Sequence, residues 1–356
     1  MVIAIDAREM ARNNLRSLGL ILCSILPYFK EYDIVLLSDV PVLQKYIPEN
    51  AINIVRGNEC KGGMDLLKYQ KWMRHELKKR KITFLYQINH FALVSMPKVK
   101  QIVVIHDLYL AENIEKIPMK TKLIYRISLF ATMIHAAHIF TVSEFSKKRL
   151  EHFYWKSNKI TVNYNGIDLP EKRNAEKLKK IDGEYFLTLG RVCYWKGTLE
   201  IARLYDKYFQ ESDIKLVIAG QAENDAIADA LKEIAERNTN IIWLNYVSNE
   251  ERESLMQNCR LFLYASRYDG FGLPPLELAI REKMVLMNDI PVLREITQDK
   301  GMYVDFYGNA ETVVGAIKRA LELNGEKLID TMQCVAKGYT WRKNAEAIKE
   351  IIRVLE

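Results

Sequence analysis

Short apolar runs alternate along the first half of the chain with longer segments in which apolar residues recur every three or four positions. The runs indicate buried strands, and the spacing between them indicates amphipathic helices. Because strand and helix follow each other repeatedly, the pattern predicts a parallel sheet with right-handed crossovers. The expected strands are residues 2–5, 34–37, 51–55, 83–87, 101–105, 138–142 and 159–162. The expected helices are residues 14–29, 65–79, 120–137 and 143–153.

The alternation begins again after a charged segment at residues 172–180, which we interpret as a linker. We therefore expect an α/β protein with two Rossmann-like βαβ domains, residues 1–170 and 171–338, and a cleft between them. A last helix, 340–355, lies in a C-terminal segment of residues 339–356 after a break at Gly338. The further expected strands are 185–189, 214–219, 241–244, 261–264 and 284–287. The further expected helices are 198–209, 224–237, 249–258, 275–281 and 310–323.

Size and composition agree with two globular domains. The chain has 356 residues, of which 49% are hydrophobic and 27% are charged. Its five cysteines form no Cys-x-x-Cys pair, and no signal peptide precedes the first strand. We therefore expect a reducing, cytoplasmic location without disulfides. The longest apolar run near the N-terminus, residues 18–29, is broken by Pro27 and is too short to span a bilayer.

Positive charge is concentrated in the first half of the chain. The net charge is +7, but residues 1–170 hold 25 Lys and Arg against 15 Asp and Glu. The densest part runs from Lys61 to Lys81, with eight basic and two acidic residues. Nucleic acid, an anionic membrane or a phosphorylated acceptor could each explain such a patch, and a solvated helix face is the plainer interpretation.

The stretch from Ser266 to Glu277 reads S-R-Y-D-G-F-G-L-P-P-L-E and follows an expected strand. Pro275 suits the first turn of a helix, whose free N–H groups favour an anion. Asp269 and Glu277 fit either a catalytic acid–base pair or two acceptors for sugar hydroxyls. The plainer interpretations are a turn residue before glycine and a first-turn helix acid.

Two more groups of polar residues follow expected strands. Arg191 and Lys196 lie five residues apart after strand 185–189, and this pair of cations suits a diphosphate. His106 and Asp107 follow strand 101–105, at an edge where open α/β sheets bind ligands. The chain has no Gly-x-Gly-x-x-Gly after a strand, no P-loop, no Gly-x-Ser-x-Gly and no His-Glu-x-x-His. These absences argue against a standard dinucleotide fold, an NTPase and a bound catalytic metal.

Taken together in this order and spacing, the motifs resemble the family-4 retaining glycosyltransferases of the GT-B fold over nearly the whole chain. The variant is most similar to bacterial mannosyltransferase-type enzymes of surface polysaccharide assembly. The matching segments are residues 5–8, 106–108, 141–147, 165–168, 190–197 and 266–277.

The resemblance implies a role for each matching residue on the donor side. Arg191 and Lys196 should bind the diphosphate of a nucleoside diphosphate sugar and stabilise charge on the leaving nucleotide. Glu277 should accept hydrogen bonds from the ribose hydroxyls, and Asp269 should hold the transferred sugar. The other expected donor-binding residues are Gly190, Gly270, Phe271, Gly272 and Leu273.

In the N-terminal domain, the resemblance implies that His106 contacts the transferred sugar. Asp107, Ser143 and Glu144 should lie near the cleft, on the acceptor side. The final helix should cross back onto the N-terminal domain, as it generally does in the GT-B fold.

The expected reaction is transfer of a sugar to a hydroxyl of a glycan or lipid-linked acceptor, with retention and without a metal or other cofactor. A mannose-type GDP-sugar is the first expectation for the donor, and a UDP-sugar is the alternative. The helix from Lys61 to Lys81 would contact an anionic membrane peripherally, and no nucleic-acid partner is expected.

Three departures from the family pattern keep two other functions open. Asp269 stands where the family usually has Glu, residues 11–16 replace a glycine-rich loop, and residues 283–286 replace a Gly-x-Pro-Val turn. The chain could therefore be a non-catalytic subunit that binds nucleotide sugars. A nucleotide-sugar epimerase of similar fold is the other alternative.

Overall fold

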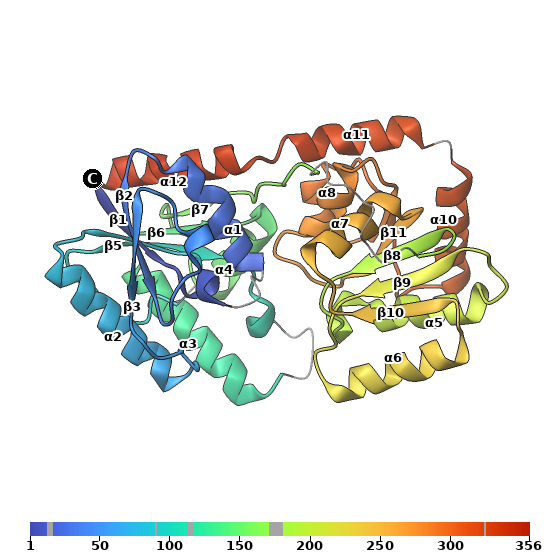
Figure 1. Cartoon of the computed structure of the whole chain (residues 1–356), viewed down its shortest axis with the longest axis horizontal. Coiled ribbons are helices and arrows are strands. Elements are labelled where there is room, and N and C mark those ends of the chain that lie inside the picture. The colour runs from blue at the N-terminus through green and yellow to red at the C-terminus, as the bar shows by residue number, and fades with distance from the viewer. Residues whose placement is uncertain (13–16, 90, 113–116, 171–180, 324) are drawn as a thin grey trace. The chain divides into compact units, whose positions relative to one another are not determined.

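The computed structural model describes residues 1–12, 17–89, 91–112, 117–170, 181–323 and 325–356. The chain divides into two compact units (Figure 1). Unit 1 comprises Met1–Gly166 and Thr340–Glu356, and unit 2 comprises Ile167–Tyr339. The linker expected at residues 172–180 and the first residues of the helix expected at 14–29 lie outside the described part of the chain.

Unit 1 is built on a seven-stranded parallel sheet with the order β3-β2-β1-β4-β5-β6-β7. The strand order reverses at β1, as in a doubly wound fold. The strands are β1 (Val2–Asp6), β2 (Asp33–Ser38), β3 (Ala51–Val55), β4 (Phe84–Gln87), β5 (Lys100–Ile105), β6 (His138–Thr141) and β7 (Ile160–Val162). The α-helices are α1 (Ser17–Ile25), α2 (Met64–Lys79), α3 (Met119–His135), α4 (Glu144–Phe153) and α12 (Trp341–Leu355). Short 3-10 turns are Arg8–Ala11, Leu26–Tyr28, Gln44–Tyr46 and Tyr109–Ala111.

A buried ion pair closes the carboxyl end of β1. The Arg8 guanidinium donates to Asp6 at 2.6 Å, and both side chains are almost fully buried. The Tyr69 hydroxyl of α2 donates to Asp6 at 3.2 Å and to the Leu37 carbonyl at 2.8 Å. Because a buried charge needs partners, this group fixes α2 against the end of β1.

The last helix packs within unit 1. The Asn163 side chain donates to the Asn344 carbonyl at 3.0 Å, and the Asn344 side chain donates to the Tyr164 carbonyl at 2.8 Å. The Lys349 ammonium of α12 lies 2.9 Å from the Glu31 carboxylate. These contacts join the end of the chain to segments 180 or more positions earlier, within one unit.

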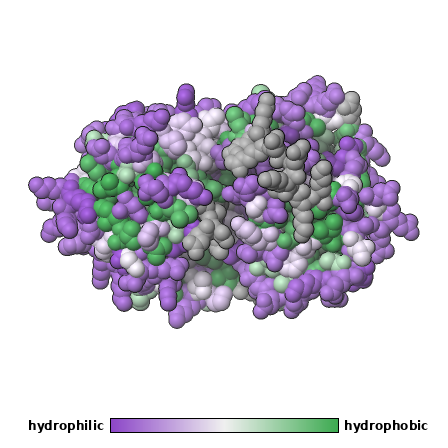
Figure 2. All heavy atoms as spheres, viewed as in Figure 1, coloured by the Kyte–Doolittle hydropathy of each residue, from purple (hydrophilic) through white to green (hydrophobic). Residues whose placement is uncertain are grey.

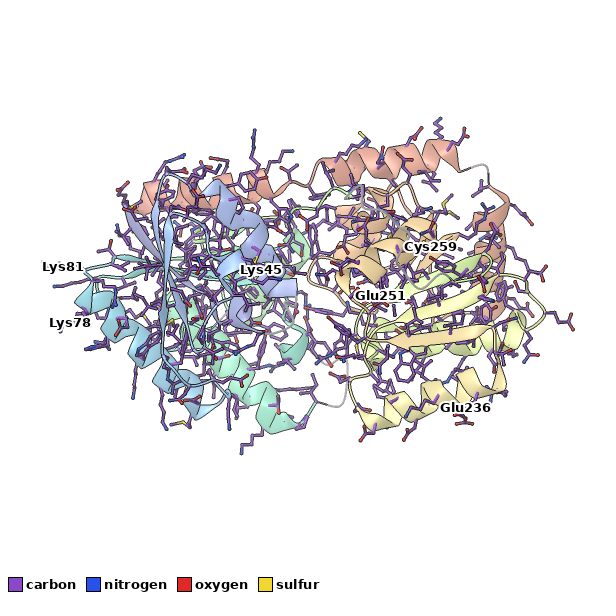
Figure 3. The ribbon with its side chains drawn as sticks, viewed as in Figure 1. Lys45, Lys78, Lys81, Glu236, Glu251 and Cys259 are labelled. Atoms are coloured by element: carbon purple, nitrogen blue, oxygen red, sulfur yellow. The ribbon has the colours of Figure 1, made fainter. Side chains whose placement is uncertain are left out.

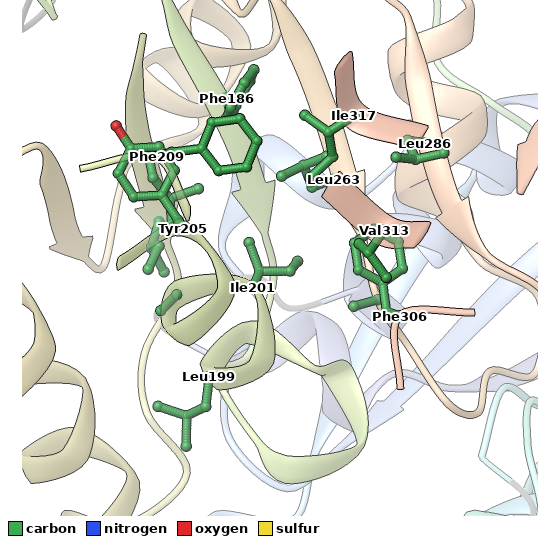
Figure 4. Packing of buried hydrophobic residues seen from close by; sticks show 14 of the residues in the cluster. Phe186, Leu199, Ile201, Tyr205, Phe209, Leu263, Leu286, Phe306, Val313 and Ile317 are labelled. Carbon is green, nitrogen blue, oxygen red and sulfur yellow. The ribbon is translucent and has the colours of Figure 1, made fainter. Parts of the chain in front are cut away.

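Unit 2 repeats the plan with a six-stranded parallel sheet of order β10-β9-β8-β11-β12-β13. Figure 4 shows aliphatic and aromatic side chains packed against this sheet: Ile201 and Tyr205 from α5 (Thr198–Tyr208), the adjoining Phe209, and Val313 and Ile317 from α10 (Ala310–Glu322). The strands are β8 (Tyr185–Leu189), β9 (Lys215–Ala219), β10 (Ile241–Asn245), β11 (Leu261–Tyr264), β12 (Val285–Asn288) and β13 (Met302–Val304). The helices are α5 (Thr198–Tyr208), α6 (Asp225–Arg237), α7 (Asn249–Asn258), α8 (Leu273–Ala279), α9 (Pro291–Ile296), α10 (Ala310–Glu322) and α11 (Glu326–Lys337), with a 3-10 turn at Tyr194–Lys196.

The prediction of two parallel-sheet α/β units is confirmed, and several details differ. Helices α9 and α11 and strand β13 were not expected. Helix α8 begins at Leu273 instead of Pro275, because prolines fit several positions of a first turn whose N–H groups have no helical acceptor. Within the described residues, no helix combines the length and apolar character needed to cross a bilayer.

Candidate active site

The first loop of the site leaves the end of β8 and makes a close crossing with the loop after β9. Gly190 has a φ of 122°, in the region that favours glycine, and its N–H donates to the Ala219 carbonyl at 3.0 Å. The Val192 N–H donates to the Gln221 carbonyl at 2.9 Å. A Cβ added at Gly220 would overlap the Gly190 carbonyl oxygen, so the two loops can approach this closely only because residue 220 is a glycine.

We expect Gly220→Ala to lower the free energy of unfolding by about 1–3 kcal/mol, because the added methyl forces the two loops apart. Gly315→Ala is the matched control. The Cβ of that variant, in the middle of α10, would have only Arg319 Nη1 nearby, at 3.5 Å, and alanine favours the helix by up to about 1 kcal/mol. Urea unfolding of both variants checks the prediction, and equal stability of Gly220→Ala and the wild type would show that the crossing is not tight.

The second loop follows β11 and is hydrogen-bonded to the first. The Arg267 N–H donates to the Trp195 carbonyl at 2.7 Å, and the buried Ser266 hydroxyl lies 3.4 Å from the same oxygen. The Tyr307 hydroxyl donates to the Ala265 carbonyl at 2.7 Å. The two loops therefore hold each other in place, although 71 residues separate Trp195 from Ser266.

Lys196, Asp269 and Tyr264 meet where the two loops join. The Lys196 ammonium forms an ion pair with Asp269 Oδ1 and lies 3.2 Å from the Tyr264 hydroxyl. The Tyr264 hydroxyl donates to Asp269 Oδ2 at 2.8 Å. The Asp269 side chain is 11% exposed and the Lys196 side chain 23%, so the cluster is mostly buried.

The electrostatics keep this cluster charged. Burial disfavours the ammonium of Lys196, but the Asp269 charge and the hydrogen bonds outweigh it and raise the pKa of Lys196 above its ordinary value. Burial, followed by the Asp269 charge, raises the pKa of Tyr264, so this phenol stays protonated. The cluster therefore presents a permanent cation beside a hydrogen-bonded carboxylate.

Arg191 and Glu277 lie near the ends of these loops with different partners. The Arg191 side chain is 56% exposed and lies 3.3 Å from Glu223. A solvent-exposed ion pair of this kind contributes little to stability, so the Arg191 guanidinium can release Glu223 and bind an anionic ligand instead. Glu277 Oε2 accepts from Arg252 Nη2 of α7 at 2.5 Å. Burial disfavours the charge of Arg252, but Glu277 outweighs it, and the pKa of Arg252 is raised.

The backbone between the two acids is largely buried. Phe271 packs its ring against Tyr339 with the centroids 5.5 Å apart. Gly272 has a φ of 94° and is the N-cap of α8, and Leu273 is the first residue of that helix. Gly270 is buried beside Asp269. Helix α8 has only seven residues, so its dipole makes a small contribution to the site.

The remaining predicted site residues share one edge of the sheet of unit 1. His106 and Asp107 follow β5, and Ser143 and Glu144 follow β6, which pairs with β5 in parallel. Ser143 is the N-cap of α4, and its hydroxyl accepts from the Ser146 N–H at 3.0 Å. This capping role explains Ser143 without any ligand.

His106 is better placed for a ligand than the N-cap serine. Burial lowers the pKa of its imidazole to about 4, despite an opposing hydrogen bond to the Ile88 backbone. Its buried Nε2 has no hydrogen-bond partner in the described part of the chain. Because the neutral ring uses one nitrogen for the hydrogen bond to the Ile88 backbone, the other nitrogen is left to bind a hydroxyl.

The sequence did not point to Tyr264 or Arg252. Tyr264 ends an apolar strand and resembles a core residue, and Arg252 is one of many charged residues on α7. Asp269 and Glu277 also lack the environment of an acid–base pair, because each is engaged with a cation. Among the described residues, no group of three or more His, Cys, Asp and Glu side chains could hold a metal ion.

Two family models match consecutive parts of the chain. Glycosyltransferase Family 4 matches residues 45–171, and Glycosyl transferases group 1 matches residues 170–341. The chain belongs to the group 1 and family 4 glycosyltransferases. The strand–loop–helix segments that carry Arg191, Lys196, Asp269 and Glu277 lie within the group 1 match.

Several proteins similar to this glycosyltransferase are named as bacterial mannosyltransferases. The serotype-specific mannosyltransferase WbdA of Escherichia coli is 28% identical over 191 residues, which are 52% of this chain and 23% of WbdA. The O-antigen chain mannosyltransferase RfbU of Salmonella typhimurium is 26% identical over 188 residues, 52% of this chain and 51% of RfbU. The chain thus spans under a quarter of the length of WbdA and about half that of RfbU.

Solved structures of glycosyltransferases share the fold over the whole chain. WaaG, a glycosyltransferase involved in lipopolysaccharide biosynthesis, has a TM-score of 0.76 at 12% identity, with 99% of each chain covered. Anabaena HepE in complex with UDP-glucose also has a TM-score of 0.76, at 14% identity and 99% coverage of each chain. The predicted GT-B fold of this glycosyltransferase is thereby confirmed.

Proposed function

We propose that the chain transfers a mannose-type sugar from a nucleoside diphosphate sugar to a hydroxyl of a glycan or lipid-linked acceptor, with retention and without a metal or resident cofactor. The observation that carries the proposal is the Lys196–Asp269–Tyr264 cluster, which two hydrogen-bonded loops hold in place. The chain that contains this cluster is a glycosyltransferase by family. The names of its relatives support the sugar: besides WbdA and RfbU, one from Xanthomonas oryzae is called a GDP-mannose:cellobiosyl-diphosphopolyprenol alpha-mannosyltransferase. GDP is therefore our first choice of nucleotide, and UDP is the alternative.

The cations are the groups suited to the leaving nucleotide. As the bond between the sugar and the diphosphate breaks, negative charge grows on the phosphate oxygens, and a preplaced ammonium stabilises it. Lys196 supplies this charge, and Arg191 can add the two-pronged contact that a guanidinium makes with phosphate. A leaving phosphate oxygen can take the proton of the acceptor hydroxyl, so the proposal needs no separate general base.

The acids are suited to hold the neutral parts of the donor. Arg252 engages Glu277 Oε2, which orients the carboxylate so that Oε1 can accept from the ribose hydroxyls. Asp269 can accept from a sugar hydroxyl while Tyr264 and Lys196 fix its position. We propose that His106 contacts the same sugar through Nε2, and that Asp107 and Glu144 lie on the acceptor side.

The setting of the reaction is part of the proposal. All five cysteines are free, which suits a reducing compartment, and we propose a cytoplasmic location where nucleotide sugars are the available donors.

A thermal-shift screen with GDP, UDP, ADP and TDP tests the donor. Binding at 100 times the Kd should stabilise the protein by about 2.7 kcal/mol, and we expect GDP to give the largest shift. Incubation with the matching nucleotide sugar and acceptor then separates the alternatives. New glycosidic product supports transfer, binding without product indicates a donor-binding subunit, and an epimerised sugar in the NMR spectrum indicates an epimerase. No shift with any nucleotide would contradict all three functions.

A further inference from the structure

The outward face of α3 is apolar. At about 100° per residue, Met119, Leu123, Ile127, Phe130 and Ile134 fall within roughly 80° of the helix circumference. These five side chains and Ile124 are 47–78% exposed, whereas Tyr125, Leu129 and Met133 of the same helix are buried in unit 1. Figure 2 shows hydrophilic residues over most of the visible surface, with hydrophobic areas among them. Exposed apolar surface of this kind marks an interaction site.

The charges on α3 have one sign. The helix carries Lys120, Lys122 and Arg126 and contains no acidic residue. By the same helical geometry, Lys120 borders the apolar stripe on one side, and Lys122 and Arg126 border it on the other. A stripe of apolar residues with cations along its borders is the pattern of a helix that lies in the plane of a membrane interface.

Aromatic residues extend the stripe beyond the helix. The Phe130 ring packs edge-on against Trp155, with the centroids 5.9 Å apart, and Trp155 is 42% exposed. The Tyr154 hydroxyl donates to the Arg126 carbonyl at 2.7 Å, which holds this aromatic cluster against α3. Trp and Tyr are the side chains that favour the headgroup region of a bilayer.

Helix α2 lies on the same face of the sheet as α3 (Figure 1). The segment 91–94 joins them, since Val94 N–H donates to the Gln70 side chain of α2 at 3.0 Å and Ala92 N–H donates to the Thr132 hydroxyl of α3 at 3.1 Å. The exposed positions of α2 are mostly basic, and Figure 3 shows Lys78 at the outer end of this helix, pointing away from the sheet. Both acids of the basic segment, Asp65 and Glu76, are paired with arginines.

We propose that α3 is a membrane-docking helix that inserts its apolar stripe into an anionic lipid bilayer, while the cations of α2 add long-range attraction. The sequence pointed to α2 alone, but α2 offers little apolar surface to insert. A second copy of the chain fits the stripe less well, because a two-fold contact would bring the cations of two α3 helices together. The proposal depends only on unit 1 and holds whether or not the chain transfers a sugar.

Vesicle flotation tests the proposal directly. The full chain should float with vesicles of phosphatidylcholine containing about 30% phosphatidylglycerol at about 0.1 M salt, and bind pure phosphatidylcholine more weakly. The double variant Leu123→Gln/Ile127→Gln should lower the partition coefficient at least ~10-fold, because two apolar side chains no longer enter the bilayer. Lys68→Gln/Lys71→Gln on α2 should also lower binding to anionic vesicles by up to ~10-fold and leave binding to neutral vesicles unchanged.

The double variant Leu43→Gln/Ile52→Gln is the matched control, since these residues of unit 1 are similarly exposed, at 49% and 58%, but lie outside α3. It should bind as the wild type does, and circular dichroism should show the same melting temperature for all variants. Absence of wild-type binding to anionic vesicles, or an equal loss in the control, would overturn the proposal. The proposal would also be overturned if the wild type were a dimer in analytical ultracentrifugation and the Leu123→Gln/Ile127→Gln variant were a monomer. Unchanged binding of the α2 variant would overturn the role of α2.

Discussion

Replacing Lys196 with alanine is expected to lower kcat at least ~100-fold, with a smaller change in KM. The loss corresponds to one charge contact that strengthens as the leaving diphosphate develops negative charge. Arg191 is the other cation proposed to bind the diphosphate. Its side chain is exposed and lies 3.3 Å from Glu223, so it cannot replace a preplaced ammonium. The measurement is steady-state transfer from the nucleotide sugar that gives the largest thermal shift.

Two further variants separate the charge of Lys196 from its place in the fold. Lys196→Arg keeps a cation next to Asp269 and should retain more activity than the alanine variant, although a guanidinium does not reproduce the ammonium geometry. Lys232→Ala removes an exposed lysine of α6, 3.9 Å from Asp229, and should leave the kinetics unchanged. Wild-type kcat in a folded Lys196→Ala protein would refute the proposed transfer mechanism.

Most elements of the fold could be predicted from the sequence because the strands are buried on both faces. Strands such as β8 and β11 are buried at every position, and they appear in the sequence as nearly continuous apolar runs. Helix α11 was not predicted from the sequence, although its buried residues Met332, Val335 and Ala336 have helical spacing. Its N-cap is Gly325, which has no side chain to cap the helix, so no start signal marks it in the sequence.

The residues of the candidate site could be predicted, but their partners could not. Arg191, Lys196, Asp269 and Glu277 each follow a strand, and motifs of that kind are local in sequence. The ion pair between Lys196 and Asp269 depends on two loops that meet across 73 residues, which no local pattern encodes. The structure therefore changes the interpretation of Asp269 from an independent sugar contact to one member of a charged cluster.

Asp269 is one of three places at which the chain departs from the usual family pattern, and its variants should separate the effect of the carboxylate charge from that of side-chain length. We expect Asp269→Ala to lower kcat/KM at least ~100-fold, because it removes both the acceptor for the sugar hydroxyl and the partner that fixes Lys196. Asp269→Asn preserves the shape but not the charge, so it should lose nearly as much. Transfer rates at saturating and limiting donor give the two kinetic constants.

Asp269→Glu should stay within ~10-fold of the wild type, because the carboxylate remains although it reaches roughly 1.5 Å further. The limit on that reach is Tyr264, whose hydroxyl lies 2.8 Å from Asp269 Oδ2 and occupies the space that a longer acid needs. Tyr264→Phe removes this hydroxyl, so Tyr264→Phe/Asp269→Glu should recover activity relative to Asp269→Glu alone, whereas Tyr264→Phe in the wild type should cost activity. If Asp269→Ala and Asp269→Glu are both as active as the wild type, the carboxylate has no part in transfer, and the donor-binding subunit becomes the better account of the chain.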